Sequence, residues 1–287
     1  MEFRTLHGIN ESELLNVFNE AFANYFVPVQ LTAEQMKEMI KAEYVDLDLS
    51  AGAFVNKKLV GFVLHATDRI DGRNVVYNAG TGVIPEQRGQ NFTWRLYDFV
   101  LPALRARNTD EVVLEVITQN APAIKIYEGI GFTAERRLPC YRGTITATGN
   151  AAVQVKELSH YDWSLFNSFR DFTPTWQNSN RTLNELKETN KLYGAFVDEQ
   201  QVGYLVYNPT SKRVQQFAVD PAFRRRKVAS SLFARILAHT DSTVIVNVDG
   251  RYEGTHAFLK KMGLEVFVEQ EMMRLVVRRE MGDGRRE

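Results

Sequence analysis

The pattern of hydrophobic and polar positions in the first half of the chain changes between two periods. Apolar residues recur at helical spacing in 14–22 and 33–40, which predicts two amphipathic helices. Apolar runs bounded by polar turns then predict strands at 51–55, 59–67 and 75–83. After Arg88 the helical spacing returns, and Pro102 should kink this helix or end it early.

The pattern continues with a strand at 112–117 and a short helix at 121–128. Asn120 is placed to cap this helix, and Gly131 to stop it before another strand. The second half repeats the same order of elements. Helices, an antiparallel meander and a strand–helix–strand pair predict a mixed α/β (α+β) fold with a largely antiparallel sheet.

Two halves of the chain also repeat in sequence. Residues 52–55 and 60–62 recur as 194–197 and 202–204, at an offset of 142, and each pair has the pattern of a β-hairpin. Residues 83–85 followed by Arg88 recur as 219–221 followed by Arg224, at an offset of 136. A repeat of this length is a whole domain. We therefore expect two tandem domains, 1–145 and 151–287, joined through 142–151.

Composition limits the classes of function. The 287 residues hold 35 Lys and Arg against 35 Asp and Glu, so zero net charge gives no general attraction to nucleic acid or to an anionic membrane. No apolar run approaches the ~20 residues of a membrane span. Cys140 is the one cysteine and five histidines are scattered, so we expect neither a disulfide nor a metal site, and a cytoplasmic protein.

The segment 83–93 has the form of an anion-binding turn. A strand ends near Val83 and a helix begins a few residues later, after Arg88 and Gly89. Backbone N–H groups of such a turn and of the helix start form a concave site that suits a diphosphate. Glycine permits a positive φ and close approach of an anion. An ordinary strand-to-helix turn with a surface arginine is the alternative.

A second piece, 115–132, contains Asn120, Ala123, Tyr127 and then Gly131 followed by Phe132. This spacing resembles the second signature of the GNAT acetyltransferases, and the turn at 88–89 resembles the acetyl-CoA site of that superfamily. The motifs occupy only 83–132, whereas the similarity in architecture covers both halves. The resemblance implies two tandem GNAT-like acyl-CoA N-acyltransferase domains and acetyl-CoA as co-substrate.

The resemblance also implies roles for individual residues. Tyr127 would give a proton to the leaving thiolate, and the backbone N–H near Val83 would bind the thioester carbonyl. A core aromatic is the alternative for Tyr127. The expected cofactor-binding residues are Val83, Arg88, Gly89, Gln90, Asn91, Phe92, Thr93, Asn120, Ala123 and Tyr127. Asn91 and Thr93 replace two small residues of the family pattern, although Asn tolerates left-handed backbone.

The general base is open between two interpretations. Glu115 lies twelve residues before Tyr127, where some peptide N-terminal acetyltransferases of the superfamily carry their base. Because side chains alternate along a strand, Glu115 would point inward or into a cleft. An ion pair with Arg105 or Arg107 is an equally weighted alternative.

The second copy lacks these features. Arg225 and Lys227 stand where the first copy has Gly89 and Asn91, and Leu259 stands at the position of Tyr127. Bulky side chains should obstruct a diphosphate, and no phenol is available there. We interpret this half as a structural or substrate-shaping domain.

The leading hypothesis is an acetyl-CoA-dependent N-acetyltransferase whose acceptor is a primary amine of a small molecule or a peptide N-terminus. Residues 24–31 either line the acceptor pocket, as in relatives, or only pack against the domain. The main alternative is a non-catalytic CoA-binding sensor or interaction module. Similarity to the tandem-GNAT thiol-cofactor synthases gives a further enzyme subtype, and the basic run 224–227 is a weak case for nucleic-acid binding. The sequence identifies neither the acceptor nor the oligomeric state.

Overall fold

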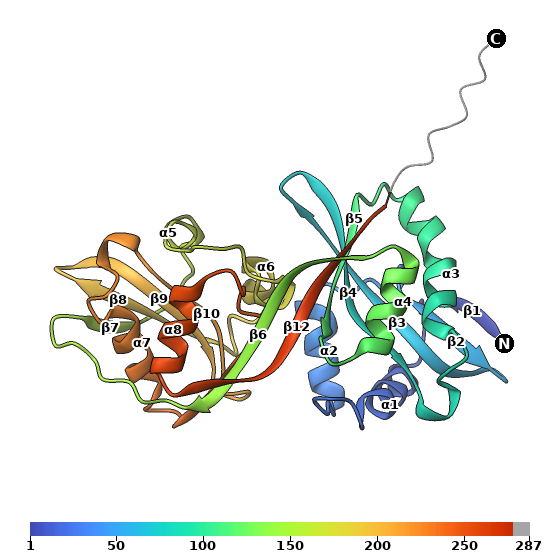
Figure 1. Cartoon of the computed structure of the whole chain (residues 1–287), viewed down its shortest axis with the longest axis horizontal. Coiled ribbons are helices and arrows are strands. Elements are labelled where there is room, and N and C mark those ends of the chain that lie inside the picture. Colours follow the sequence, from blue (N-terminus) through green and yellow to red (C-terminus); the bar gives the residue numbers. More distant parts are fainter. Residues whose placement is uncertain (278–287) are drawn as a thin grey trace, which may run out of the picture. The chain divides into compact units, whose positions relative to one another are not determined.

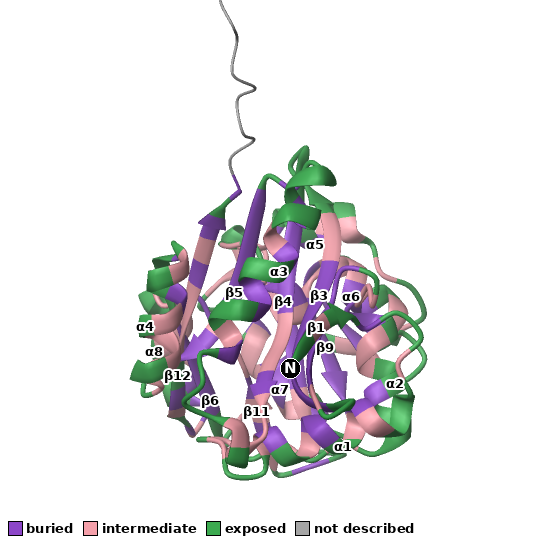
Figure 2. Cartoon of the chain, turned by 90° about the vertical axis from the view of Figure 1, so that its right-hand side faces the viewer, coloured by how far each residue is buried: buried purple, intermediate pink, exposed green. Residues whose placement is uncertain are grey.

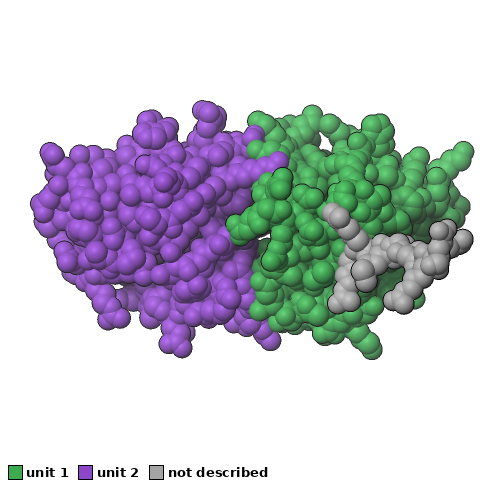
Figure 3. Space-filling view, turned by 90° about the horizontal axis from the view of Figure 1, so that it is seen from above, with its two compact units in different colours: residues 1–135, 271–287 green, residues 136–270 purple. Residues whose placement is uncertain are grey.

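The structure is a computed structural model that describes residues 1–277 (Figure 1). Its residues form two compact units. Among the described residues, unit 1 consists of Met1–Glu135 and 271–277, and unit 2 consists of Arg136–Gln270 (Figure 3). Each unit has its own run of strands and its own helices.

Unit 1 has four α-helices and one 3₁₀ turn around a sheet. Its elements in chain order are β1 (Glu2–Thr5), α1 (Glu11–Phe22), α2 (Ala33–Ala42), β2 (Ala51–Val55), β3 (Lys58–Ile70), β4 (Arg73–Val83), η1 (Pro85–Gln87), α3 (Phe92–Ala106), β5 (Glu111–Ile117) and α4 (Ala121–Ile130). Two longer strands, β6 (Thr133–Thr144) and β12 (Leu264–Val276), begin in one unit and end in the other.

The strands of unit 1 follow the order β1-β2-β3-β4-β5, and β12 lies next to β5. Strands β1 to β4 are antiparallel, whereas β5 runs parallel to β4 because helix α3 carries the chain back across the sheet. The parallel register covers only Val75–Tyr77 against Glu111–Val113. Beyond Tyr77 the two strands no longer pair.

Two apolar clusters cover the sheet of unit 1. Helices α3 and α4 pack on one cluster through Leu96, Tyr97 and Tyr127, and α1 and α2 belong to the other through Phe18 and Met36. Helix α3 alternates buried and exposed residues, while β5 is buried along most of its length (Figure 2). This is the amphipathic pattern that the sequence predicts for a helix on a sheet.

Unit 2 repeats this arrangement. Its elements are β7 (Gln154–Leu158), α5 (Trp163–Ser168), η2 (Trp176–Asn178), α6 (Asn180–Glu185), β8 (Lys191–Val197), β9 (Gln200–Asn208), β10 (Arg213–Val219), η3 (Pro221–Phe223), α7 (Val228–Ile236), β11 (Ser242–Ile245) and α8 (Glu253–Lys261). The strand order is β6-β11-β10-β9-β8-β7, again with one parallel pair, β10 and β11. The mixed, largely antiparallel α/β fold expected from the sequence is confirmed.

The two hairpins of the repeat have the same two-residue turn. Asn56 and Lys57 have φ values of 50° and 66°, and Asp198 and Glu199 have φ values of 48° and 66°. Positive φ at both central residues is the signature of a type I′ turn, whose twist matches that of the strands. Of the two effects expected of Pro102, an early end does not occur, because α3 continues past it to Ala106.

The boundaries of the two units differ from the domain limits expected from the sequence, 1–145 and 151–287. Those limits describe the two copies of the repeat and stay a prediction. Met273 and Leu275 of β12 are buried in the core of unit 1. In the same unit Arg274 forms ion pairs with Glu111 and Glu135. The repeat in the sequence marks the two copies, but it does not show which core the last strand, β12, packs into.

Candidate active site

The turn after β4 has the backbone that an anion-binding loop requires. Gly89 has a φ of +77° and Asn91 a φ of 58°, so both residues lie in the left-handed region. The expectation that Asn91 tolerates this conformation is confirmed. Asn91 is the N-cap of α3 but makes no side-chain cap bond, so its side chain does not satisfy the N–H groups of the first helical turn. Phe92 is buried in the core and offers only its backbone, while Thr93 is half-buried.

The guanidinium of Arg88 is hydrogen-bonded to backbone carbonyls of the protein. Its Nε donates to the carbonyl oxygen of Val83 at 3.2 Å, and its Nη2 donates to that of Ala21 at 2.8 Å. The guanidinium therefore ties the end of β4 to α1 and holds the turn in place. Gln90 is exposed, and its amide donates to the side chain of Gln87 at 3.2 Å.

Beyond Tyr77, the edge of β4 that no longer pairs with β5 carries N–H groups that point away from β3. The N–H of Ile84 donates to the carbonyl of Val60 at 2.9 Å, so these two residues form a hydrogen-bonded pair. In an antiparallel ladder such pairs alternate with pairs whose backbone groups point away from the partner. Val83 and Thr81 are in the second class, opposite Gly61 and Val63. Their N–H groups point to the side where β5 has separated.

Tyr127 lies where its hydroxyl meets this part of β4. The side chain is 7 % exposed, and the hydroxyl is hydrogen-bonded to the side chains of Thr81 and Asn78. Asn78 also donates to the Thr81 and Tyr97 hydroxyls, each at 2.8 Å. Burial, and to a smaller extent Tyr25, raises the pKa of Tyr127 to about 12, although the bonds to Thr81 and Asn78 oppose the rise. The phenol is therefore protonated at any working pH.

Asn120 caps α4 as expected, because its Oδ1 accepts the N–H of Ala123 at 3.3 Å. Its Nδ2 donates to the hydroxyl of Tyr25 at 3.2 Å. Tyr25 belongs to the segment that we expected either to line an acceptor pocket or to pack. The next residue, Phe26, is 50 % exposed and lies edge-on to the Tyr25 ring at 5.4 Å.

Glu115 lies on the face of β5 opposite Tyr127. Val116 and Leu114, its two neighbours, face the cluster that contains Tyr127, so the alternation of the strand turns Glu115 the other way. Its carboxylate accepts the Tyr77 hydroxyl at 2.5 Å. Arg107, one of the two arginines considered as a partner, pairs with Asp46 at 3.3 Å.

Unit 2 keeps the backbone of the turn but not its chemistry. Arg225 and Lys227 have φ values of 62° and 63°, close to those of Gly89 and Asn91. Arg224 repeats the bonds of Arg88, with Nε to the carbonyl of Val219 at 3.0 Å and Nη2 to that of Phe169 at 3.0 Å. The arginine therefore has the same structural role in both copies.

The polar network around Tyr127 has no counterpart in unit 2. At the repeat offsets, the four residues of the network are replaced by apolar side chains, namely Val214 for Asn78, Phe217 for Thr81, Phe233 for Tyr97 and Leu259 for Tyr127. Phe217 and Phe233 pack edge-to-face at 5.2 Å. The other two, Val214 and Leu259, are buried in the same core cluster as Phe233, and Phe217 packs against this cluster. No hydroxyl stands there to protonate a thiolate.

Within residues 1–277, no group of three or more His, Cys, Asp and Glu side chains is arranged to hold a metal ion. Over the same residues, no helix combines the length and the apolar character that a membrane span needs.

Each of the two copies matches a known protein family model. A model of the acetyltransferase (GNAT) family matches residues 14–132, and a model of the acetyltransferase (GNAT) domain matches residues 157–273. The chain belongs to the GNAT superfamily. It is a tandem GNAT protein, as the two matched domains and the repeated order of elements indicate.

Two curated relatives of this GNAT protein are acetyltransferases. It is 34 % identical over 134 residues to a mycothiol acetyltransferase of Thermobispora bispora, a match that covers 44 % of each chain. It is 30 % identical over 95 residues to N-alpha-acetyltransferase 30 of Schizosaccharomyces pombe, a match that covers 33 % of this chain and 63 % of the relative. In both cases the match spans less than two thirds of the relative.

Solved structures show the same tandem fold. A tandem GNAT protein from the clavulanic acid biosynthesis pathway has a TM-score of 0.74 at 13 % identity, over 96 % of this chain and 98 % of the other. A putative acetyltransferase from Pyrococcus horikoshii has a TM-score of 0.70 at 14 % identity, over 97 % and 90 %. At these identities the likeness concerns the fold alone.

Sequence reasoning missed three residues of the site: Asn78, Thr81 and Tyr77. Thr81 lies two residues before Val83, so the strand alternation could have placed it on the same side. Asn78 and Tyr77 carry no motif signal, because their importance comes from contacts with α3, α4 and β5.

Proposed function

We propose that this GNAT protein is an acetyl-CoA-dependent N-acetyltransferase and that unit 1 carries the reaction. Acetyl transfer forms a C–N bond, breaks the C–S bond of the thioester, removes a proton from the amine and gives a proton to the leaving sulfur. The proposal rests mainly on Tyr127, a protonated phenol fixed by Thr81 and Asn78 beside the unpaired edge of β4.

The residues of unit 1 supply what the reaction needs. The N–H groups of Val83 and Thr81 point to the side that β5 leaves, so they are placed to stabilise the developing oxyanion. The turn at Gly89 and Asn91, with the first N–H groups of α3, would hold the diphosphate of CoA. Asn120 and Ala123 would border the pantetheine arm at the start of α4.

The pKa of Tyr127 determines how it acts. A phenol whose pKa is about 12 does not transfer its proton completely to a thiolate whose acid has a pKa near ~8.5 in water. It can stabilise the developing charge on sulfur with a hydrogen bond, and the thiolate takes its proton from solvent water once it leaves the water-poor site. Tyr127 would therefore stay in its acid form throughout the working pH range.

We propose Glu115 as the general base, with Tyr77 as the hydroxyl that orients it. The 2.5 Å bond between them places the carboxylate on the face of β5 away from Tyr127. An amine that approaches from this face would reach the thioester from the side opposite the acid. A purely structural bond to Tyr77 is the alternative, and a Glu115→Gln variant distinguishes the two. Loss of the base lowers kcat and leaves the urea midpoint unchanged, whereas loss of a structural bond lowers the urea midpoint.

The acceptor would be a primary amine of a small molecule or a peptide N-terminus. One relative is named for mycothiol and the other for N-alpha acetylation, so the names of the relatives cover both kinds of acceptor. Exposed Phe26 beside Tyr25 offers an apolar surface near α4 on which an acceptor side chain could pack. We also propose a cytoplasmic location, on the basis of the single cysteine.

A non-catalytic CoA-binding module is the second candidate, favoured by the departures from the family pattern at Asn91 and Thr93. The deciding experiment measures thiol release from acetyl-CoA with a panel of small primary amines and short peptides with free N-termini, for wild type and Tyr127→Phe. Turnover that the variant strongly reduces supports the enzyme. Tight binding of acetyl-CoA with no amine-dependent thiol release in any arm supports the module.

A further inference from the structure

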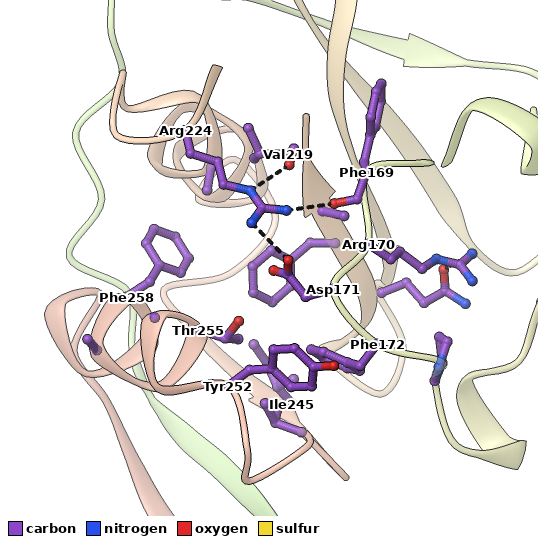
Figure 4. Close-up of a pocket in the computed structure, with 18 of the residues that line it drawn as sticks. Phe169, Arg170, Asp171, Phe172, Val219, Arg224, Ile245, Tyr252, Thr255 and Phe258 are labelled. Atoms are coloured by element: carbon purple, nitrogen blue, oxygen red, sulfur yellow. Dashed lines mark hydrogen bonds and ion pairs between the residues drawn. The ribbon is translucent and has the colours of Figure 1, made fainter. Parts of the chain in front are cut away.

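Unit 2 contains a pocket with a volume of about 1060 Å³. It lies between β10, β11 and α8, with the segment that follows α5 on its other side (Figure 4). A pocket of this size accommodates a drug-sized molecule. Because Leu259 and Phe217 replace Tyr127 and Thr81, acetyl transfer does not explain its presence.

The charge of the lining is strongly positive. Six basic side chains line the pocket, against only Asp171 and Glu253 on the acidic side. The carboxylate of Asp171 is already paired with Arg224 at 2.9 Å, as Figure 4 shows. Arg225 and Lys227, both exposed, stand at the start of α7, where the helix dipole adds further positive potential.

Arg170 is the most informative of these cations. It is half-buried, and its guanidinium donates to the hydroxyl of Tyr204 at 2.8 Å and to the side-chain oxygens of Asn180 at 2.5 Å and Gln216 at 2.9 Å. Among the residues that the structure describes, none of these acceptors is a carboxylate. A partly buried cation with neutral partners only leaves the pocket electrostatically unbalanced, and an anion would restore the balance.

A second polar group is also unsatisfied. Gln215 is 8 % exposed and lines the pocket, and its Oε1 is buried without a hydrogen-bond partner within the described part of the chain. The residue sits on a β-bulge, because the register of β10 with β9 skips from Val214 to Gln216. A bulge redirects a side chain. A buried carbonyl oxygen without a donor is costly, and a ligand with an N–H or O–H group would satisfy it.

Two pairs of aromatic rings also line the pocket. Phe172 and Tyr252 pack against each other at 5.0 Å, as the close-up shows (Figure 4), and Phe217 and Phe258 are 5.7 Å apart. These rings provide an apolar surface for the body of a ligand.

We propose that the pocket of unit 2 is a non-catalytic binding site for a small organic acid with an aromatic or acyl body and one N–H or O–H donor. The acid group would lie near Arg170 and the basic start of α7, the donor on Oε1 of Gln215, and the body against the aromatic rings. This inference goes beyond the proposed acetyl transfer and does not depend on it.

The test uses two fluorescent probes on the full chain. The anionic probe is 2-anilinonaphthalene-6-sulfonate, which combines an acid group, aromatic rings and one N–H donor. The matched control is N-phenyl-2-naphthylamine, which has the same rings and N–H but no acid. We expect the anionic probe to bind one site per chain at least about tenfold more tightly than the neutral one.

Three variants locate this site. Arg170→Gln should weaken binding of the anionic probe about tenfold and leave the neutral probe unchanged. Because Arg170 also bonds three neighbours, Lys227→Gln at an exposed position provides a second charge variant with little risk to folding. Gln215→Met should weaken both probes about fivefold without lowering the urea midpoint, since it removes an unsatisfied acceptor. Gly89→Arg in unit 1 should leave probe binding unchanged.

Equal affinity for the two probes, or unchanged affinity in all three variants of unit 2, would overturn the proposal. So would stoichiometric displacement of the anionic probe by acetyl-CoA in the Gly89→Arg background, since the pocket would then be a second thioester site.

Discussion

The buried imidazole of His65 makes a specific prediction about the stability of unit 1 in acid. His65 lies on β3 opposite Asn78, the residue that holds Tyr127, and packs edge-to-face on Tyr97 at 5.9 Å. Its Nδ1 hydrogen-bonds the carbonyl of Leu49 at 2.9 Å, while Nε2 is buried without a partner in the described chain. Burial lowers the pKa to about 4, although the Leu49 bond and Asp46 oppose the shift.

The direction of the pH effect on stability follows from the difference between the His65 pKa in the folded and the unfolded states. The unfolded chain binds a proton at His65 near pH ~6.5, whereas the folded chain does so only near pH 4. The neutral His65 therefore leaves the free energy of unfolding at its full value above pH ~6.5. This free energy falls as the pH drops to about 4, because the unfolded chain takes up the proton first. A shift of this size corresponds to about 3 kcal/mol in total, of which about 2 kcal/mol is lost by pH ~5.

The assay is hydrogen exchange in β3 and β4 at several pH values, for wild type and His65→Gln. The variant loses the titratable group but shares every other titration with the wild type. We expect it to be less stable than wild type at pH ~7, and the gap in free energy of opening to shrink by about 2 kcal/mol at pH ~5. The exchange of β8 and β9 in unit 2 should be the same in both proteins. A gap independent of pH would refute the reasoning.

Four further predictions concern the site and the two cores. Tyr127→Phe should lower kcat by about 10²- to 10³-fold, as expected for loss of a hydrogen bond to the charge that develops on sulfur, while Tyr97→Phe causes a smaller loss; equal losses in thiol-release assays would assign Tyr127 a packing role. Wild-type kcat should show no alkaline decline from Tyr127 between pH ~8 and pH ~10.5, because its pKa is about 12. Arg136→Met should destabilise unit 2 by about 1 to 3 kcal/mol in urea unfolding, because Arg136 is 9 % exposed and pairs at 2.5 Å with Asp249, which is 1 % exposed and keeps its ion pair with Arg251 in the variant; an unchanged midpoint would show that the pair contributes little. Met273→Ala should cost unit 1 about 2 to 5 kcal/mol and speed hydrogen exchange in β5, whereas an effect confined to unit 2 would contradict the unit assignment.

Local chemistry explains what the sequence could predict. The hairpin at residues 56–57 follows from apolar runs around a turn that accepts positive φ, and Asn120 and Gly131 mark the ends of α4 because caps depend on adjacent residues. Strand β1 has only four residues, Glu2–Thr5, too few for a visible period.

Features that depend on distant residues were not predictable in the same way. The place of β12 in the core of unit 1 depends on contacts between residues more than 100 positions apart, such as Arg274 with Glu135. Tyr127 was found through its motif, but its hydrogen bonds to Thr81 and Asn78 depend on how α4 lies across β4. Arg88 was expected to bind the cofactor, and the structure shows its head group on two backbone carbonyls.

Gly89 offers a matched pair of variants, because Arg225 holds the equivalent position in unit 2. No atom lies within 4 Å of a Cβ added to Gly89, and Arg225 adopts a φ of 62° in the same turn, so Gly89→Arg is expected to fold. The strain of a left-handed arginine costs about 1 to 2 kcal/mol. The reciprocal variant, Arg225→Gly, should relieve a similar strain and serves as the control.

The most direct test of the central claim is titration of acetyl-CoA by calorimetry into wild type, Gly89→Arg and Arg225→Gly. We predict one binding site per chain, lost in Gly89→Arg because the new side chain blocks close approach of the diphosphate, and retained in Arg225→Gly. No binding to wild type at millimolar acetyl-CoA, or equal binding to wild type and Gly89→Arg, would contradict the assignment of the cofactor to unit 1.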